Sequence, residues 1–245
     1  MQTVIDNILV NYEVQGKENR SAILILHGWR QNLSHWQQVA KALSQKNKVI
    51  SLDLPGFGSS SIPPTVFSTN DYATFVKKFI EKLDLSKIVL LGHCFGGKIA
   101  IKMASRSQDI SKLIIISPSG IDSKPILIKL KIIIFKPIKP LLSWLPKNLR
   151  TNLSRIFSSA DYYHASALRE TFKKIVDERV ENDAIKINIP TLIIWGENDK
   201  EINIRNSKVL KDLISNSVLR IIWKVGHSPN IETPEKLSDL LLEYI

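Results

Sequence analysis

The chain contains a single cysteine, Cys94, at the third position of the segment GHCFGG, residues 92–97. Glycines on both sides of a reactive side chain are typical of a sharp turn from a strand into a helix, because they remove Cβ atoms that would clash there. The N–H groups at the start of the following helix would favour a thiolate. The segment therefore predicts that Cys94 is a nucleophile that attacks a carbonyl carbon.

An acid and a base for this nucleophile follow later in the chain. Asp199 lies in a loop after the apolar segment 191–195, and His227 lies in a loop after the segment 218–223. Of the five histidines in the sequence, only His227 directly follows a predicted strand in the C-terminal part. The order of nucleophile, acid and base favours a triad in which His227 is the base and Asp199 orients its imidazole.

Backbone groups beside these residues can stabilise the negative charge that forms on a carbonyl oxygen during attack. Trp29, in the segment HGW after the apolar run 22–26, and Phe95, the residue after the nucleophile, are predicted to supply the two N–H groups of an oxyanion hole. His27 and His93 lie close to them in the sequence. We interpret both histidines as structural, and His27 as one that orders its loop.

The elements that position these residues are predicted to alternate between strands and helices. Short apolar segments indicate strands, and segments with one apolar face or a capping residue indicate helices. Strands are predicted over residues 3–5, 8–14, 22–26, 48–52, 87–91, 113–116, 191–195 and 218–223. This alternation predicts an α/β fold with a mainly parallel sheet covered by helices on both faces. Ligands bind such sheets beyond the carboxyl ends of the strands, where the three triad residues are expected.

Capping residues and apolar periodicity place the helices between the strands. Ser34 is expected to cap a helix over residues 35–44, and Thr233 to cap a helix that begins at Pro234. The remaining helices are predicted from Asn70 or Asp71 onward, over 97–105 and near 204–214.

Length and composition are those of one globular domain, because the chain has 245 residues, of which 44% are hydrophobic and 23% charged. A single cysteine excludes an internal disulfide and a cysteine-based metal cluster, and the scattered histidines make a metal site unexpected. No secretory signal opens the sequence, and no apolar segment reaches the roughly 18 residues that a membrane-spanning helix needs. We expect a cytoplasmic protein without a metal or cofactor.

The net charge of +11 is concentrated in one segment. Between residues 123 and 160 the sequence has eight lysines and arginines and no aspartate or glutamate, among many isoleucines and leucines. We interpret residues 118–189 as an inserted basic, apolar helical lid on a core domain formed by residues 1–117 and 190–245. Its lysines either reach solvent while its aliphatic side chains line the pocket, or attract an acidic carrier protein or an anionic membrane surface. Nucleic acid is not an expected partner, because the cations alternate with aliphatic rather than aromatic residues.

Five segments of the sequence resemble those of α/β-hydrolases. They are HGW at 27–29, DLPGFGSS at 53–60, GHCFGG at 92–97, WGENDK at 195–200 and GHSPNIETPE at 226–235. The resemblance implies an eight-stranded-type sheet with a helical lid inserted near residues 118–189, and it implies the triad and oxyanion roles given above. Asp53 and Gly56 would shape a loop near the site without taking part in the chemistry.

The resemblance also implies hydrolysis of small-molecule carboxylic esters, lactones or thioesters through a covalent acyl-enzyme. Most members of the family carry Ser where this chain has Cys94, so three interpretations stay open: a catalytic thiol, an engineered replacement of Ser by Cys, and a degenerate site on a scaffold that binds a ligand or partner. Within the enzyme class, hydrolysis of carbon–carbon bonds in diketone-like acids is the rival reaction. The dehalogenase and epoxide hydrolase reactions of the family need Asp at position 94 and are excluded.

Overall fold

Eight strands form one sheet in the part of the chain that the computed structural model describes, residues 1–16, 21–121 and 166–245. The strands are β1 (Gln2–Ile5), β2 (Ile8–Gln15), β3 (Ala22–Leu26), β4 (Lys48–Leu52), β5 (Ile88–His93), β6 (Ile110–Ile116), β7 (Thr191–Gly196) and β8 (Ser217–Ile222). Their order across the sheet is β1-β2-β4-β3-β5-β6-β7-β8. The pairs β1–β2 and β2–β4 are antiparallel, and all other neighbouring pairs are parallel. The prediction of a mainly parallel, eight-stranded sheet is confirmed.

The central strands are buried on both faces because their sequences are continuous apolar runs. All residues of β3 and of β5 are buried. The side chains of β3 alternate between two hydrophobic clusters, with Leu24 in one cluster and Ile23 and Ile25 in the other. The sheet therefore separates two cores, each closed by its own layer of helices.

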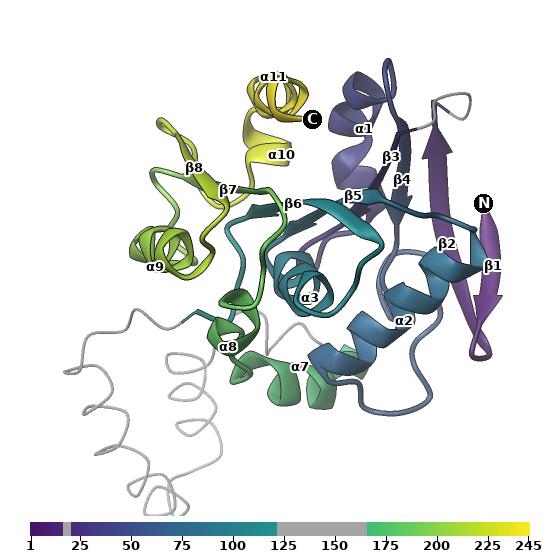
Figure 1. Cartoon of the computed structure of the whole chain (residues 1–245). Coiled ribbons are helices and arrows are strands. Elements are labelled where there is room, and N and C mark those ends of the chain that lie inside the picture. The colour runs from purple at the N-terminus through teal and green to yellow at the C-terminus, as the bar shows by residue number, and fades with distance from the viewer. Residues whose placement is uncertain (17–20, 122–165) are drawn as a thin grey trace, which may run out of the picture.

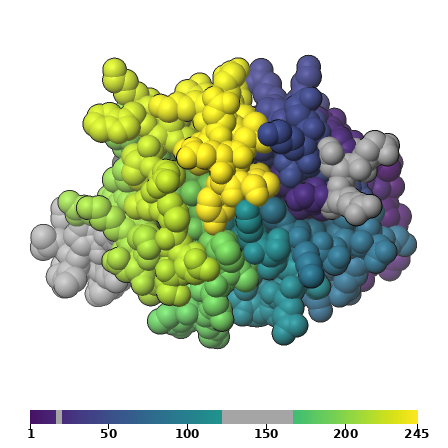
Figure 2. Space-filling model, turned by 45° about the horizontal axis from the view of Figure 1, so that its top comes forward, coloured from purple at the N-terminus to yellow at the C-terminus, as the bar shows by residue number. Residues whose placement is uncertain are grey.

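Helices cover both faces of the sheet (Figure 1). They are α1 (Gln37–Leu43), α2 (Thr69–Lys82), α3 (Phe95–Ala104), α7 (Arg169–Val176), α8 (Glu181–Ala184), α9 (Arg205–Leu213), α10 (Pro229–Glu232) and α11 (Pro234–Tyr244). Buried side chains of α1 and α11 belong to one core, and those of α2, α3 and α9 belong to the other. In Figure 2 the yellow C-terminal segment lies beside the blue-violet segment that contains α1. The helical covering of both faces agrees with the predicted fold class.

The first helical turn begins earlier than predicted. Asn32, rather than Ser34, is the capping residue, and its side chain accepts hydrogen bonds from the Ser34 N–H at 3.0 Å and the Ser34 hydroxyl at 2.6 Å. Ser34 lies inside a short 3-10 turn, Leu33–Trp36, that leads into α1. Asn and Ser are similarly good caps, so the extended backbone of Asn32, which local sequence does not specify, decides between them.

Two further helix starts also depend on capping. Ser68 caps α2 and exchanges hydrogen bonds with Asp71, so α2 begins ahead of the predicted Asn70 or Asp71. Pro234 is the first residue of α11, as predicted, and Thr233 precedes it. Thr233 is the N-cap residue of α11, as predicted, but its side chain makes no capping hydrogen bond, and its hydroxyl is buried without a hydrogen-bond partner among the described residues.

Cations on α3 connect the core to the described segment 166–189. Lys98 and Lys102 are four residues apart and lie on one face of the helix, and Arg106 follows its last residue, Ala104. The ammonium of Lys98 donates to the carbonyl of Ile175 in the last turn of α7. Lys102 and Arg106 form ion pairs with Asp183 on α8, at 3.2 and 3.3 Å. These contacts fix α7 and α8 against the helix that follows Cys94.

The predicted lid, residues 118–189, lies between the end of β6 and the start of β7 in the sequence. Only 118–121 and 166–189 belong to the described residues, so the basic segment 123–160 lies outside them. The division into core and lid stays a prediction. None of the helices within the described residues is both long enough and apolar enough to cross a bilayer.

Candidate active site

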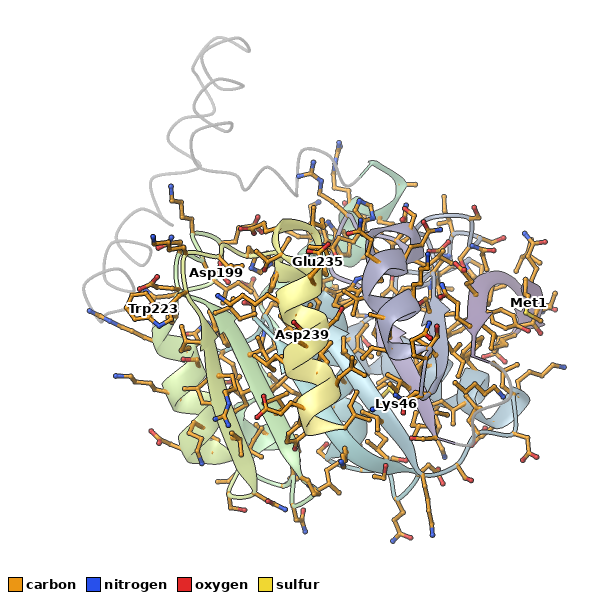
Figure 3. The ribbon with its side chains drawn as sticks, turned by 90° about the horizontal axis from the view of Figure 1, so that it is seen from above. Met1, Lys46, Asp199, Trp223, Glu235 and Asp239 are labelled. Atoms are coloured by element: carbon orange, nitrogen blue, oxygen red, sulfur yellow. The ribbon has the colours of Figure 1, made fainter. Side chains whose placement is uncertain are left out.

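The predicted site residues gather at one edge of the sheet because the parallel strands end there in register. Leu26 at the end of β3 pairs with Gly92 near the end of β5, and Gly196 pairs with Ile222 at the ends of β7 and β8. The loops that follow these four strands carry Trp29, Cys94, Asp199 and His227. Figure 3 shows Asp199 beyond the ends of β7 and β8.

Cys94 occupies a strained turn between β5 and α3. Its φ of 50° and ψ of −108° lie in a region that side chains other than glycine rarely adopt. The backbone on either side is packed too closely for side chains, since a Cβ on Gly92 would lie 2.4 Å from the carbonyl oxygen of Gly96. The Cys94 N–H donates to the carbonyl of Ile116 at 2.9 Å. The turn thus holds the thiol, which is partly exposed, above the start of α3.

Asp199 and His227 form a buried pair beside this turn. The Nδ1 of His227 donates to Oδ2 of Asp199 at 2.9 Å, and the side chain of Asp199 has no exposed surface. The other carboxylate oxygen accepts the N–H groups of Glu201 and Ile202, both at 2.9 Å. Burial alone would raise the pKa of Asp199, but the hydrogen bond from His227 and the Ile202 N–H hold that pKa below its ordinary value. Asp199 is therefore an anion that fixes the orientation of the imidazole.

The imidazole of His227 bridges Asp199 and Cys94. Burial lowers the pKa of His227, but hydrogen bonds to Asp199 and Cys94, together with their charges, raise it to about 11. Because Nδ1 is bonded to Asp199, the bond to Cys94 uses Nε2. The carboxylate of Glu201 lies on the same side of the ring, 3.5 Å from Nε2. The structure thus brings the three predicted triad residues together and adds Glu201, which the sequence did not indicate.

Trp29 and Phe95, the predicted oxyanion residues, are neighbours in the structure. Their rings meet edge to face with centroids 5.5 Å apart. Phe95 is the first residue of α3, where a backbone N–H has no acceptor within the helix. The N–H of Gly96 donates to the carbonyl of His27 at 3.1 Å, which joins the two loops. That the N–H groups of Trp29 and Phe95 form an oxyanion hole stays a prediction.

His27 and His93 are buried and hold loops in place. Nδ1 of His27 donates to the carbonyl of Gly28 at 2.8 Å, and its Nε2 accepts the N–H of Leu54 at 3.0 Å. Nε2 of His93 donates to the backbone carbonyl of His227 at 2.9 Å. Burial lowers the pKa of His27 to about 4 and that of His93 to about 3, so both rings are neutral at pH 7. This geometry agrees with the structural interpretation of the two histidines.

Asp53 organises the predicted loop near the site. Its carboxylate accepts the side-chain amide of Asn11 at 2.8 Å, the N–H of Leu33 at 2.7 Å and the N–H of Ser59 at 2.9 Å. Asp53 makes no contact with the triad in these bonds. It joins the loop after β4 to the segment that follows Trp29, in keeping with a shaping role.

Two further residues support the His227 loop, and sequence reasoning gave them no role. The carboxylate of Glu232 accepts the N–H groups of Gly226 at 2.7 Å and Ser228 at 3.0 Å, on either side of His227. The amide of Gln31 donates to the Ser228 hydroxyl at 3.3 Å. An acidic residue a few positions after a predicted base is a signal that could have identified Glu232. Gln31 contacts Ser228 only through the fold, so no local signal marks it.

A cavity of about 190 Å³ opens beside Cys94. Its walls are largely apolar and include Trp29, Phe95 and Phe172, while Glu201 lies among its lining residues. A larger cavity of about 340 Å³ lies between α2 and α3, away from Cys94. We assign the candidate site to the smaller cavity, because that cavity contains the nucleophile.

Comparisons with known proteins agree with this fold. A family model described as alpha/beta hydrolase fold matches residues 21–138. An uncharacterized hydrolase of Bacillus subtilis is 27% identical over 98% of this chain and 96% of its own length. A monoacylglycerol lipase of Mus musculus is 25% identical over 96% of this chain and 78% of its own length. A solved structure of a membrane phospholipase A is 24% identical, with a TM-score of 0.80, and the match covers all of this chain and 84% of that chain.

The chain has the alpha/beta hydrolase fold. It is a hydrolase of this fold, and its relatives include lipases.

Proposed function

We propose that this protein hydrolyses carboxylic esters, and related lactones or thioesters, through a covalent acyl-enzyme on Cys94. The observation that carries the proposal is the placement of the His227 imidazole between the buried Asp199 carboxylate and the Cys94 thiol. The mouse relative, a monoacylglycerol lipase, supports ester bonds as the substrate class. The same groups could also hydrolyse carbon–carbon bonds, but the similarity to lipases favours esters.

The raised pKa of His227 makes its imidazole a good acceptor for the thiol proton of Cys94, whose transfer leaves the attacking thiolate. The thiolate of Cys94 attacks the ester carbonyl, and the N–H groups of Trp29 and Phe95 stabilise the oxyanion. As the C–O bond breaks, Nε2 of His227 gives its proton to the leaving alcohol. The products of this half-reaction are a thioester on Cys94, a free alcohol and a neutral imidazole.

Water completes the cycle through the same imidazole. Nε2 of His227 takes a proton from water as the water oxygen attacks the thioester carbonyl. The carbon–sulfur bond breaks, the acid leaves, and the thiolate–imidazolium pair is restored. Asp199 keeps Nε2 directed at the reacting atoms in both halves, because its oxygens are bonded to Nδ1 of the imidazole and to two backbone N–H groups.

The strained backbone at Cys94 argues against a scaffold that only binds a ligand or partner. A φ of 50° costs stability, and such strain persists at functional sites where the surrounding structure enforces it. Burying the Asp199–His227 pair also costs free energy, because both groups lose contact with water. Both features surround the single thiol of the chain, which supports chemistry at that atom.

The test is hydrolysis of p-nitrophenyl butyrate by the wild-type protein, Cys94→Ala and Cys94→Ser. We expect Cys94→Ala to lose at least about 1,000-fold in kcat/KM, because it has no nucleophile. Cys94→Ser keeps a nucleophilic oxygen and controls for the loss of the thiol itself. Iodoacetamide should inactivate the wild type and leave any activity of Cys94→Ser unchanged. Turnover by Cys94→Ala at the wild-type rate would overturn the proposal.

A further inference from the structure

Within the part of the chain that the structure describes, Glu201 places a carboxylate beside the reacting nitrogen of His227. Its Oε2 lies 3.5 Å from Nε2, and its side chain is 66% exposed at the rim of the cavity that contains Cys94. The separation is longer than a normal hydrogen bond, so Glu201 does not hold the imidazole as Asp199 does. Its carboxylate instead faces the space that a substrate must enter.

The chemistry of the site decides which part of a substrate would lie there. The leaving alcohol receives its proton from Nε2, so its oxygen must come within about 3 Å of that atom. Atoms attached one or two carbons away from this oxygen then lie within reach of the Glu201 carboxylate. The remaining walls offer the aromatic rings of Trp29, Phe95 and Phe172, which suit apolar parts of the substrate.

Other charges near this space are already engaged. The Asp199 carboxylate is bonded to Nδ1 of His227 and to two backbone N–H groups. The Lys98 ammonium, at the other side of the cavity, donates to the carbonyl of Ile175. Among the described lining residues, Glu201 therefore supplies the negative charge that meets the leaving group.

We propose that Glu201 is a specificity residue that selects esters whose leaving alcohol carries a hydroxyl group or a positive charge close to the ester oxygen. The inference rests on the proposed function, since it needs Nε2 of His227 to protonate the leaving group. A polyol such as glycerol would donate a hydrogen bond to the carboxylate, and a cationic alcohol would be attracted by its charge. Leaving groups that carry a carboxylate or phosphate would be repelled.

The test uses two pairs of butyrate esters whose leaving groups match in shape. Choline butyrate is compared with 3,3-dimethylbutyl butyrate, which replaces the charged nitrogen by carbon. Glycerol monobutyrate is compared with propyl butyrate, which lacks the two hydroxyl groups. The four kcat/KM values are measured for the wild type, Glu201→Gln, Glu201→Leu and, as a control for net charge, Glu243→Gln on the remote end of α11.

We expect the wild type to prefer the choline ester over its neutral partner by about three- to fivefold, the size typical of an exposed charge pair. Glu201→Gln should bring this ratio close to one and keep the preference for the glycerol ester, because an amide oxygen still accepts hydrogen bonds. Glu201→Leu should lose both preferences, and Glu243→Gln should keep both. Raising the salt concentration should reduce the choline ratio alone.

The results that would contradict these expectations distinguish failure of the inference about Glu201 from failure of the proposed function. Ratios that do not change in Glu201→Leu would overturn the inference while leaving ester hydrolysis intact. An equal loss on all four esters in Glu201→Leu would also overturn it, because Glu201 would then act only through the position of His227. If the wild type hydrolyses p-nitrophenyl butyrate but none of the four esters, this inference alone is overturned. If it hydrolyses neither p-nitrophenyl butyrate nor the four esters, the proposed function is overturned, and this inference with it.

Discussion

His93 is next to the proposed nucleophile in the sequence, but its role in the structure is to support the loop of His227. It directly precedes Cys94, yet its Nε2 donates to the backbone carbonyl of His227, and its side chain is buried. The bond fixes the main chain of the base, whereas Asp199 fixes its imidazole. A buried neutral histidine also makes the free energy of unfolding depend on pH, because its ring takes up a proton more readily in the unfolded chain than in the folded one.

Acid should therefore destabilise the protein through its buried histidines. The pKa values of His27 and His93, about 4 and about 3, lie below the ordinary value near 6.5. Between pH 6.5 and 4 the unfolded state binds more protons than the folded state, so the free energy of unfolding falls as the pH falls. His93→Gln should remove about 1.36 kcal/mol per pH unit from this slope. The measurement is urea denaturation at pH 7, 6, 5 and 4.

Asp199 and His227 do not change the free energy of unfolding between pH 6.5 and 4. Asp199, with its lowered pKa, loses its stabilising charge only at more acidic pH, and His227, with a pKa raised to about 11, changes stability between pH 6.5 and 11. His35→Gln, which removes an exposed histidine, is the matched control. An unchanged slope in His93→Gln, or an equal change in His35→Gln, would contradict this account.

At the scale of single elements, α3 has two functions in the molecule. Its first residues contact the nucleophile, and its cations attach the segment 166–189. Lys98 is 2% exposed, and burial lowers its pKa to about 8. The folded protein therefore gives up this proton more readily than the unfolded chain, whose lysines titrate near pH 10.4.

Lys98→Met should stabilise the protein most at neutral pH. Below pH 8 the wild type keeps a charge in an apolar place, and that cost disappears as the pH rises from 8 towards 10.4. The difference in unfolding free energy between variant and wild type should therefore shrink by roughly 2–3 kcal/mol from pH 7 to pH 10. His227 makes both proteins less stable as the pH rises over this range, and this contribution cancels in the difference between variant and wild type. Lys41→Met, at an exposed position on α1, should show no such change, and a constant difference in Lys98→Met would refute the prediction.

Local sequence predicts the strands better than the helix starts. Continuous apolar runs such as 22–26 and 48–52 coincide with β3 and β4, because burial on both faces leaves no other place for them. Helix starts depend on which of several nearby polar side chains bonds the first free N–H. The backbone before Asn32 and Ser68 decides this, and it is set by the fold.

Some residues of the candidate site can likewise be predicted from local sequence, and others depend on the fold. Cys94, Asp199 and His227 follow apolar strands, so their meeting at one sheet edge could be predicted from the order of the elements. Glu201 follows Asp199 by two residues, but its approach to Nε2 of His227 depends on the path of the loop. The bond between Gln31 and Ser228 joins positions 197 apart in the sequence, and no local pattern specifies it.

At the scale of the whole molecule, the positive charge of the sequence is distributed unevenly, and much of it belongs to a segment outside the described residues. The chain carries +11, and residues 123–160 contain eight cations and no acidic residue. Because these cations alternate with aliphatic residues, we propose that this segment binds an anionic membrane surface. Each lysine near such a surface contributes about 1 kcal/mol, and salt weakens the attraction.

Vesicle binding tests this directly. The protein should sediment with phosphatidylglycerol vesicles at low salt, much less with phosphatidylcholine vesicles, and be released at about 0.5 M NaCl. Changing Lys129, Lys131, Lys136 and Lys139 to Gln should abolish binding and leave hydrolysis of p-nitrophenyl butyrate unchanged. Binding that is equal for both lipids, or selective binding to an acidic carrier protein, would count against the membrane.

The parallel pair β6–β7 lies between the part of the chain that carries the proposed nucleophile and the part that carries the proposed acid and base. Cys94 and the predicted oxyanion residues lie before residue 117, and Asp199 and His227 lie after residue 190. The hydrogen bonds between these two strands, from Leu113↔Thr191 to Ile116↔Ile194, join the two halves of the sheet. Neither half contains a complete set of reacting groups. The proposed catalysis therefore requires these two parts of the polypeptide to pack together, through β6–β7 and through contacts such as the bond from His93 to His227 and the packing of α1 against α11.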